Sequence, residues 1–157
     1  MKLDNQQIAF KKLHKNGDIP YGLLALADPS RELVDEYLKH SDVYLASQNE
    51  TTLGVIVLCP LSAETIEIKN IAVSPQFQRQ GVGRFLIDKA INIAALNKHT
   101  TIRIGTANSS IGQRYLYQKA GFELIEIKKD YFTDNYAAPI YENGVRAKHL
   151  LVLEKPL

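Results

Sequence analysis

The strand, turn and helix in residues 64–97 constrain the fold more than any other feature of this sequence. The segment "ETIEIKNIAV" is rich in β-branched residues, as strands are, and "VGRFLIDKAINIAALN" repeats apolar residues at helical spacing. Gly81 and Gly83 lie between the two segments. Because a helix begins with unpaired backbone N–H groups and the positive end of its dipole, this turn suits an anion such as a phosphate.

Two well-known phosphate-binding loops do not match this turn. A dinucleotide-binding turn needs a third glycine where Leu86 stands. A P-loop needs Gly-Lys-Ser/Thr, whereas Gly83 is followed by Arg84 and Phe85. By itself the turn therefore indicates an anion site without saying which molecule carries the anion.

The remaining residues predict an α/β domain around a mixed sheet, with parallel crossovers only in its second half. Further strands are expected in residues 8–13, 42–47, 53–61, 100–107, 122–132 and 146–156. Further helices are expected in residues 17–30, 30–41 and 109–121. No repeat or linker interrupts the 157 residues, so we expect a single domain over residues 1–157.

One expected strand has an irregular apolar pattern. Ile66 and Ile68 share one parity, while Ile71 and Val73 share the other. A regular strand would place the two pairs on opposite faces. We therefore expect either burial on both faces or a bulge near residues 69–70.

Charge and composition exclude several classes of function. Lys and Arg number 19 against 17 Asp and Glu, and they are scattered, which argues against binding to nucleic acid or to an anionic membrane. The longest apolar run, "LGVIVLCPL", is too short to cross a bilayer. The first 17 residues show no apolar core of signal-peptide length, so we expect a cytoplasmic protein.

Cysteine and histidine usage predicts neither a disulfide nor a metal site. The single cysteine, Cys59, lies in an apolar run and is expected to be a small core residue. The four histidines show no metal-ligand spacing, so no metal is expected.

Two motifs together resemble the GNAT superfamily of acyl-coenzyme A N-acyltransferases. The first is Gln-x-x-Gly-x-Gly at residues 78–83, following a strand that ends in "IAV-x-P". The second is "LYQKAGF" at residues 116–122. The resemblance implies a single-domain GNAT-like fold, in which a mixed, mostly antiparallel sheet of about seven strands is flanked by about four helices.

The same resemblance implies acetyl-CoA as co-substrate, with its pyrophosphate on the glycine turn and its pantetheine arm along the preceding strand. The cofactor-binding residues that it implies are Ile71, Ala72, Val73, Gln78, Arg79, Gln80, Gly81, Val82, Gly83 and Arg84. For Arg79 and Arg84 the alternative is a solvated surface arginine.

A further cofactor contact is ambiguous. The family often places an asparagine seven residues before the tyrosine of the second motif. Ser110 stands at that position, and Asn108 lies two residues earlier. Either residue could make the contact.

Two residues are expected to move protons during direct attack of an amine on the thioester. By resemblance, Tyr117 donates a proton to the departing thiolate, because a phenol of pKa about 10 stays protonated at neutral pH. Glu67 is the expected base for the amine. The alternatives are a core aromatic for Tyr117 and an exposed edge glutamate for Glu67.

The acceptor is expected to be a primary amine, most simply a small molecule, bound opposite the pantetheine arm. Aromatic and acidic residues alternate before the last strand, and such a surface suits a cationic amine. These residues are Asp130, Tyr131, Phe132, Asp134, Tyr136, Tyr141 and Glu142. A loop that packs on its own aromatics, or that supports a homodimer, is the alternative.

The resulting hypothesis is an N-acetyltransferase that works through a ternary complex, since no persuasive nucleophile appears. Two other hypotheses stay open. One is a non-catalytic module that binds acyl-CoA as a sensor or regulatory subunit, and the other is a protein that binds ATP at the glycine turn.

Overall fold

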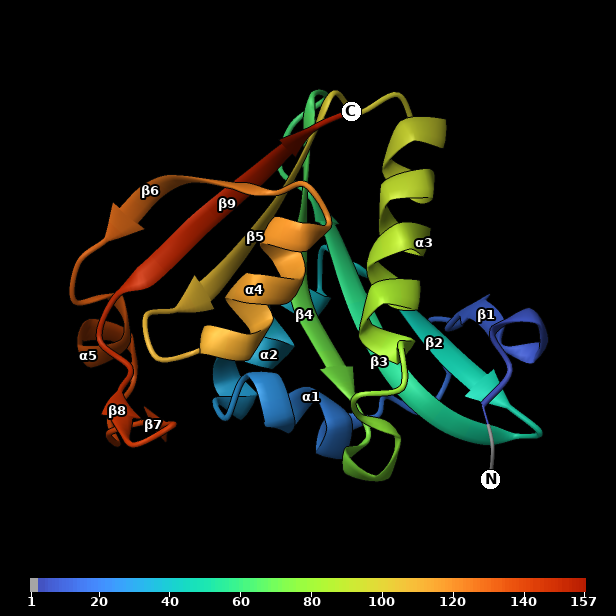
Figure 1. The fold of residues 1–157 in the computed structure, drawn as a ribbon, viewed down its shortest axis with the longest axis horizontal. Coiled ribbons are helices and arrows are strands. Elements are labelled where there is room, and N and C mark those ends of the chain that lie inside the picture. The colour runs from blue at the N-terminus through green and yellow to red at the C-terminus, as the bar shows by residue number, and fades with distance from the viewer. Residues whose placement is uncertain (1–2) are drawn as a thin grey trace.

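The computed structural model describes residues 3–157 and contains one seven-stranded sheet and a separate two-stranded hairpin (Figure 1). The large sheet has the order β1-β2-β3-β4-β5-β9-β6. Its strands are β1 (Ala9–Lys12), β2 (Asp42–Gln48), β3 (Thr51–Pro60), β4 (Thr65–Val73), β5 (Thr101–Ala107), β6 (Glu123–Lys128) and β9 (Leu150–Pro156). The hairpin pairs β7 (Tyr141–Glu142) with β8 (Val145–Arg146). All neighbouring strands are antiparallel except β4 and β5, so the expected mixed, mostly antiparallel sheet is confirmed.

Helices cover both faces of this sheet. They are α1 (Tyr21–Ala27), α2 (Arg31–Leu38), α3 (Val82–Leu96), α4 (Ile111–Lys119) and α5 (Tyr131–Asn135), with short 3₁₀ turns at Asn5–Gln7 and Pro75–Phe77. In Figure 1, α3 and α4 lie in front of the sheet, and α1 and α2 lie behind its lower part. Alternate residues of β3 separate two cores: Ile56 packs with α3, whereas Val55 and Val57 pack with α1 and α2. This alternation is what a strand buried on both faces requires.

The expected strand over residues 122–132 is too long at its C-terminal end. β6 ends at Lys128, and Asp130 adopts a left-handed conformation with φ of 60°. Tyr131 and Phe132 then begin the short helix α5 instead of extending the strand. The backbone N–H of Phe132 donates to the carbonyl of Lys148, so a partner distant in sequence sets this turn.

The bulge expected in β4 is present. Val57 of β3 pairs with Asn70, but the next residue, Leu58, pairs with Ile68, which leaves Lys69 as the extra residue. Ile66 and Ile68 before the bulge, like Ile71 and Val73 after it, all pack against the core below α3. The bulge thus returns the apolar side chains to one face after the parity change.

β4 and β5 separate beyond this bulge. Their parallel pairing runs only from Thr65 opposite Thr101 to Ile68 opposite Ile104. β5 continues to Ala107 by pairing with β9, whereas residues 70–73 of β4 pair only with β3. One backbone edge of β4 therefore faces a gap within the sheet.

Within residues 3–157, none of the helices combines the length and the apolar character needed to cross a bilayer.

Candidate active site

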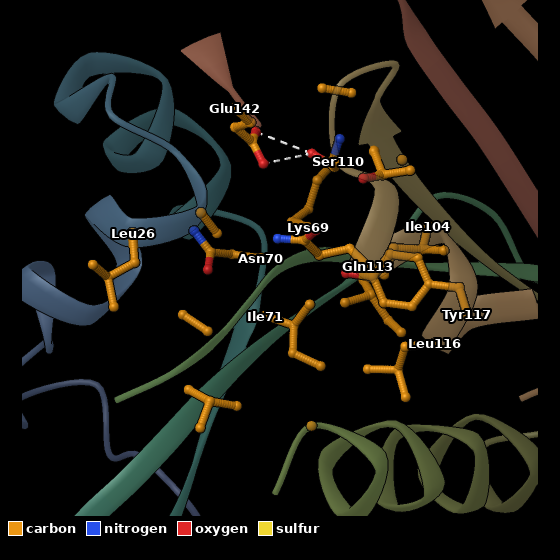
Figure 2. A pocket seen from close by; sticks show the side chains of 18 of the residues that line it. Leu26, Lys69, Asn70, Ile71, Ile104, Ser110, Gln113, Leu116, Tyr117 and Glu142 are labelled. Carbon is orange, nitrogen blue, oxygen red and sulfur yellow. Dashed lines mark hydrogen bonds between the residues drawn. The ribbon is translucent and has the colours of Figure 1, made fainter. Parts of the chain in front are cut away.

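A cavity of about 510 Å³ occupies the gap between β4 and β5 (Figure 2). Its walls come from α1, β4, β5, α4, α5 and β7. Gln78 and Gly83 of the glycine turn line it, and so do Leu26 of α1, Phe132 of α5 and Glu142 of β7. Tyr117 of α4 and Ile71 of β4 also line it. The cavity therefore connects the expected anion site with the tyrosine-rich connection.

Ile71, Ala72 and Val73 line this cavity along the free edge of β4. A strand edge presents unpaired backbone N–H and C=O groups to whatever lies beside it. An extended molecule that carries amide groups, such as a pantetheine arm, fits such an edge because it can pair with the strand as another strand would.

The glycine turn is built to leave the N-terminus of α3 open. Gly81 is the N-cap residue, with φ of 89°, and no side chain among the described residues caps the helix. A residue with a Cβ is strained in that conformation, which explains the glycine. Gly83 faces the cavity, where an added Cβ would lie 3.2 Å from Leu116 Cδ2. The turn therefore fits a phosphate group held by backbone N–H groups.

The side chains of the turn differ in their surroundings. Gln78 Nε2 donates to the carbonyl of Val73 at 3.1 Å, which ties the turn to the end of β4. Gln80 and Arg79 are exposed, while Val82 is buried in the core. Arg84 Nε lies 3.0 Å from Asp88 Oδ1.

Tyr117 lies on the cavity wall and is only 4% exposed. No hydrogen bond joins its hydroxyl to another described residue. Burial, reinforced by the charge of Glu142, raises the pKa of Tyr117 far above its usual value. The hydroxyl is therefore a protonated donor at neutral pH, on the wall of the same cavity as the β4 edge.

Glu67 does not line the cavity, but it lies just before the bulge. Its side chain is 19% exposed, and Oε1 is 2.9 Å from Lys69 Nζ. Lys69 does line the cavity, and Figure 2 shows its side chain near the middle of the view. Because Ile66 and Ile68 face the α3 side, strand alternation places Glu67 on the side of α1 and α2.

Asn108 and Ser110 are in different environments. Asn108 holds the chain before β9: its Oδ1 accepts from the backbone N–H groups of Lys148 and His149, and its Nδ2 donates to Arg146. Ser110 lines the cavity, and its hydroxyl donates to the carboxylate of Glu142. Only Ser110 therefore lies where a molecule in the cavity could touch it.

Two residues of the cavity wall have no role in the sequence motifs. Asn70 follows the bulge residue and is 3% exposed, and Glu142 stands on the hairpin β7–β8. A signal for Asn70 was available, because it is a polar residue directly before the apolar end of the strand, Ile71 to Val73. Glu142 belongs to the aromatic and acidic segment before β9, but its approach to Ser110 depends on the tertiary fold.

No group of three His, Cys, Asp or Glu side chains in the described part of the chain is arranged to hold a metal ion.

Comparison with known proteins agrees with this architecture. Residues 39–124 match the model of the acetyltransferase (GNAT) domain. The chain is 40% identical over 151 residues to the uncharacterized N-acetyltransferase YvbK of Bacillus subtilis (strain 168), covering 96% of this chain and 97% of that protein.

Two solved structures are similar over nearly the whole chain. A GNAT family acetyltransferase from Elizabethkingia anophelis with acetyl-CoA bound has a TM-score of 0.94 and 46% identity, covering 96% of this chain and 99% of that one. The IAA acetyltransferase from Bacillus cereus ATCC 14579 has a TM-score of 0.92 and 36% identity, with the same coverage. The open β4 edge, the uncapped glycine turn and these similarities lead to one conclusion: the chain belongs to the GNAT family of N-acetyltransferases.

Proposed function

We propose that this chain transfers the acetyl group of acetyl-CoA to the primary amine of a small molecule within a ternary complex. The observation that carries this proposal is the cavity itself. It runs from the uncapped end of α3, past the free edge of β4 and Tyr117, to a separate end walled by α1, α5 and β7. The related GNAT structure with acetyl-CoA bound supports the choice of co-substrate. The similar IAA acetyltransferase supports a small molecule as acceptor.

The chain would hold acetyl-CoA mainly through its backbone. N–H groups from Arg79 through Arg84 would bind the pyrophosphate, with the two arginine side chains adding positive charge. Residues 71–73 would pair with the pantetheine arm. A β4 N–H directed at the acetyl carbonyl would stabilise the negative charge that develops on its oxygen. Ser110 is the better placed of the two further cofactor contacts, because it lines the cavity.

Tyr117 would protonate the leaving group. Bound acetyl-CoA supplies the activated acetyl group; as the amine nitrogen bonds to the acetyl carbon, the carbon–sulfur bond breaks. Tyr117 then donates its hydroxyl proton to the sulfur, giving the free thiol and an amide. Burial suits this role because it keeps the hydroxyl protonated.

Glu67 would accept the proton that the amine loses, through a water molecule, since its carboxylate lies behind Lys69 and off the cavity wall. A base role predicts that Glu67→Gln slows turnover most at neutral pH. The effect should shrink toward pH 9, where more of an amine with a pKa near 10 is already neutral. A purely structural ion pair with Lys69 predicts an effect of equal size at both pH values.

The first test is thermal unfolding with acetyl-CoA, with ATP as the control. Ligand at a hundred times its dissociation constant adds about 2.7 kcal/mol to the free energy of unfolding, which raises the melting temperature by several degrees. Thiol release with a broad panel of primary amines then measures transfer. Stabilisation by ATP but not by acetyl-CoA would overturn the proposal.

A further inference from the structure

Asn70 lines the cavity, and its buried side-chain oxygen has no hydrogen-bond partner among the described residues. The residue is 3% exposed, and its Oδ1 makes no hydrogen bond to any described residue. Leaving a buried acceptor unsatisfied costs free energy, so such a group calls for a ligand or another donor. Figure 2 shows the Asn70 side chain extending toward Leu26, at the end of the cavity away from Tyr117.

The orientation of the Asn70 amide is decided by its neighbours. Nδ2 donates to the carbonyl of Leu24 at 3.0 Å and to the hydroxyl of Tyr37 at 2.9 Å. A flipped amide would place Oδ1 against the Leu24 carbonyl, which can only accept. The free atom is therefore the oxygen, and what satisfies it must be a donor such as N–H.

The charges at this end of the cavity favour a cation. Glu142 lines the cavity. Asp28, the C-cap residue of α1, does not line it but lies in the chain between two residues that do, Ala27 and Pro29. Neither carboxylate is ion-paired with a Lys, Arg or His among the described residues. Their partners are neutral groups: the Ser110 hydroxyl donates to Glu142, and the Tyr136 hydroxyl, at 2.8 Å, and the Ser30 backbone N–H donate to Asp28. The one lysine of the wall, Lys69, is ion-paired with Glu67.

The rest of this end is apolar. Leu26, Phe132, Ile140 and Tyr141 line it, and Leu26 and Tyr141 are 54% and 64% exposed. Large exposed apolar side chains around a cavity mouth are typical of a surface that binds an apolar ligand. The site thus combines one hydrogen-bond acceptor, the carboxylate of Glu142 on its wall and an apolar rim, with the Asp28 carboxylate close by in the chain.

We infer that the acceptor is a primary amine on an alkyl or aryl body, and that Asn70 Oδ1 accepts a hydrogen bond from its nitrogen. This inference rests on the proposed function and names the substrate class of the same site. An amine nitrogen keeps an N–H both as the ammonium and as the neutral nucleophile, so Asn70 holds it before and after deprotonation. Because Asn70 precedes Ile71 on β4, the amine is held beside the strand edge that faces the acetyl group.

The substrate class is tested by thiol release with saturating acetyl-CoA. The probes are n-hexylamine and phenethylamine, with hexanoate and phenethyl alcohol as matched compounds that lack the amine, and spermidine and lysine as amines without an apolar body. We expect turnover with the two apolar amines at a kcat/KM at least tenfold above that for spermidine or lysine, and none with the acid or the alcohol. Turnover confined to the polar amines, or none with either apolar amine, would overturn the inference.

The role of Asn70 is tested with Asn70→Leu and the milder Asn70→Ser, against Tyr37→Phe as the control. Tyr37→Phe removes one partner of Nδ2 but leaves Oδ1 in place. We expect the Asn70 variants to raise KM for phenethylamine by about tenfold to a hundredfold, the range for loss of a hydrogen bond to a charged group. KM for acetyl-CoA should change less than twofold. If Asn70 only braces α1 and α2, all three variants lower the melting temperature and none changes KM for the amine.

These outcomes separate the inference from the proposed function. If acetyl-CoA stabilises the protein and only polar amines are acetylated, the proposed acetyltransferase function is supported and the inferred apolar substrate class is wrong. If acetyl-CoA neither stabilises the protein nor releases thiol with any amine, the proposed function fails first. Acetyl-CoA stabilisation of the Asn70 variants also shows that they are folded, so that a raised KM is interpretable.

Discussion

Ser110 Oγ lies 3.0 and 2.9 Å from the two carboxylate oxygens of Glu142, and so joins the start of α4 to the hairpin β7–β8. The same hairpin is held by Asn143, whose Nδ2 donates to the carbonyl of Ser109 at 2.9 Å. The part of the cavity wall that the hairpin forms is therefore attached to the helix that carries Tyr117.

Ser110→Ala should loosen this support. Loss of the hydrogen bond to Glu142 is expected to lower the free energy of unfolding by about 1 kcal/mol, measured by urea denaturation. Asn143→Ala, which removes the other attachment of the hairpin, serves as the comparison. If Ser110 also contacts the cofactor, Ser110→Ala alone weakens acetyl-CoA binding, and calorimetry with both variants distinguishes the two effects.

Tyr117→Phe should lower kcat about a hundredfold or more, within the range for loss of a general acid, while the Kd of acetyl-CoA changes less than twofold. Tyr115, on the same helix and 64% exposed, provides the matched control, and Tyr115→Phe should behave as wild type. Because burial raises the pKa of Tyr117, the wild-type rate should not decline through ionisation of this group between pH 7 and 9. Equal kcat in Tyr117→Phe and wild type would remove Tyr117 from the mechanism.

Gly81→Ala should damage both stability and cofactor binding. With φ of 89° at this position, an alanine costs about 1–2 kcal/mol, and relaxation of the turn would misdirect the N–H groups at the start of α3. Gly112 is the control: it lies in α4 with nothing within 4 Å of an added Cβ, so Gly112→Ala should stabilise the protein by up to about 1 kcal/mol. Thermal unfolding and calorimetry with acetyl-CoA measure both effects. Unchanged acetyl-CoA affinity in Gly81→Ala would argue against a phosphate at this turn.

Alkaline pH should destabilise the protein partly through Tyr37. Burial, together with the nearby Asp28 carboxylate, raises the pKa of Tyr37 to about 12. In the unfolded chain a tyrosine ionises near pH 10, so the stability that Tyr37 contributes is complete below pH 10 and is lost as the pH rises toward 12. Urea denaturation at pH 9 and 11 should show a smaller loss of stability in Tyr37→Phe than in wild type. The exposed Tyr115→Phe should show the wild-type loss.

The local elements of this protein could be predicted because their signals are local. The apolar period of α3 and the parity change in β4 both follow from side-chain alternation within a few residues. The two motifs added the fold and the family. Helix α5 was missed because its first turn depends on Lys148, which lies far away along the chain.

The sequence by itself therefore determined the seven strands of the large sheet and predicted an anion site at the turn, but for the irregularity of β4 it left a bulge and burial on both faces as alternatives. Only the tertiary structure decided where β4 leaves β5, because that depends on β9 pairing with β5 along its whole length. It also decided which polar residues face the cavity: Ser110 and Asn70 do, whereas Glu67 lies behind Lys69. The partners concerned, Glu142 and Leu24, are 32 and 46 residues away from Ser110 and Asn70, beyond the reach of any local pattern.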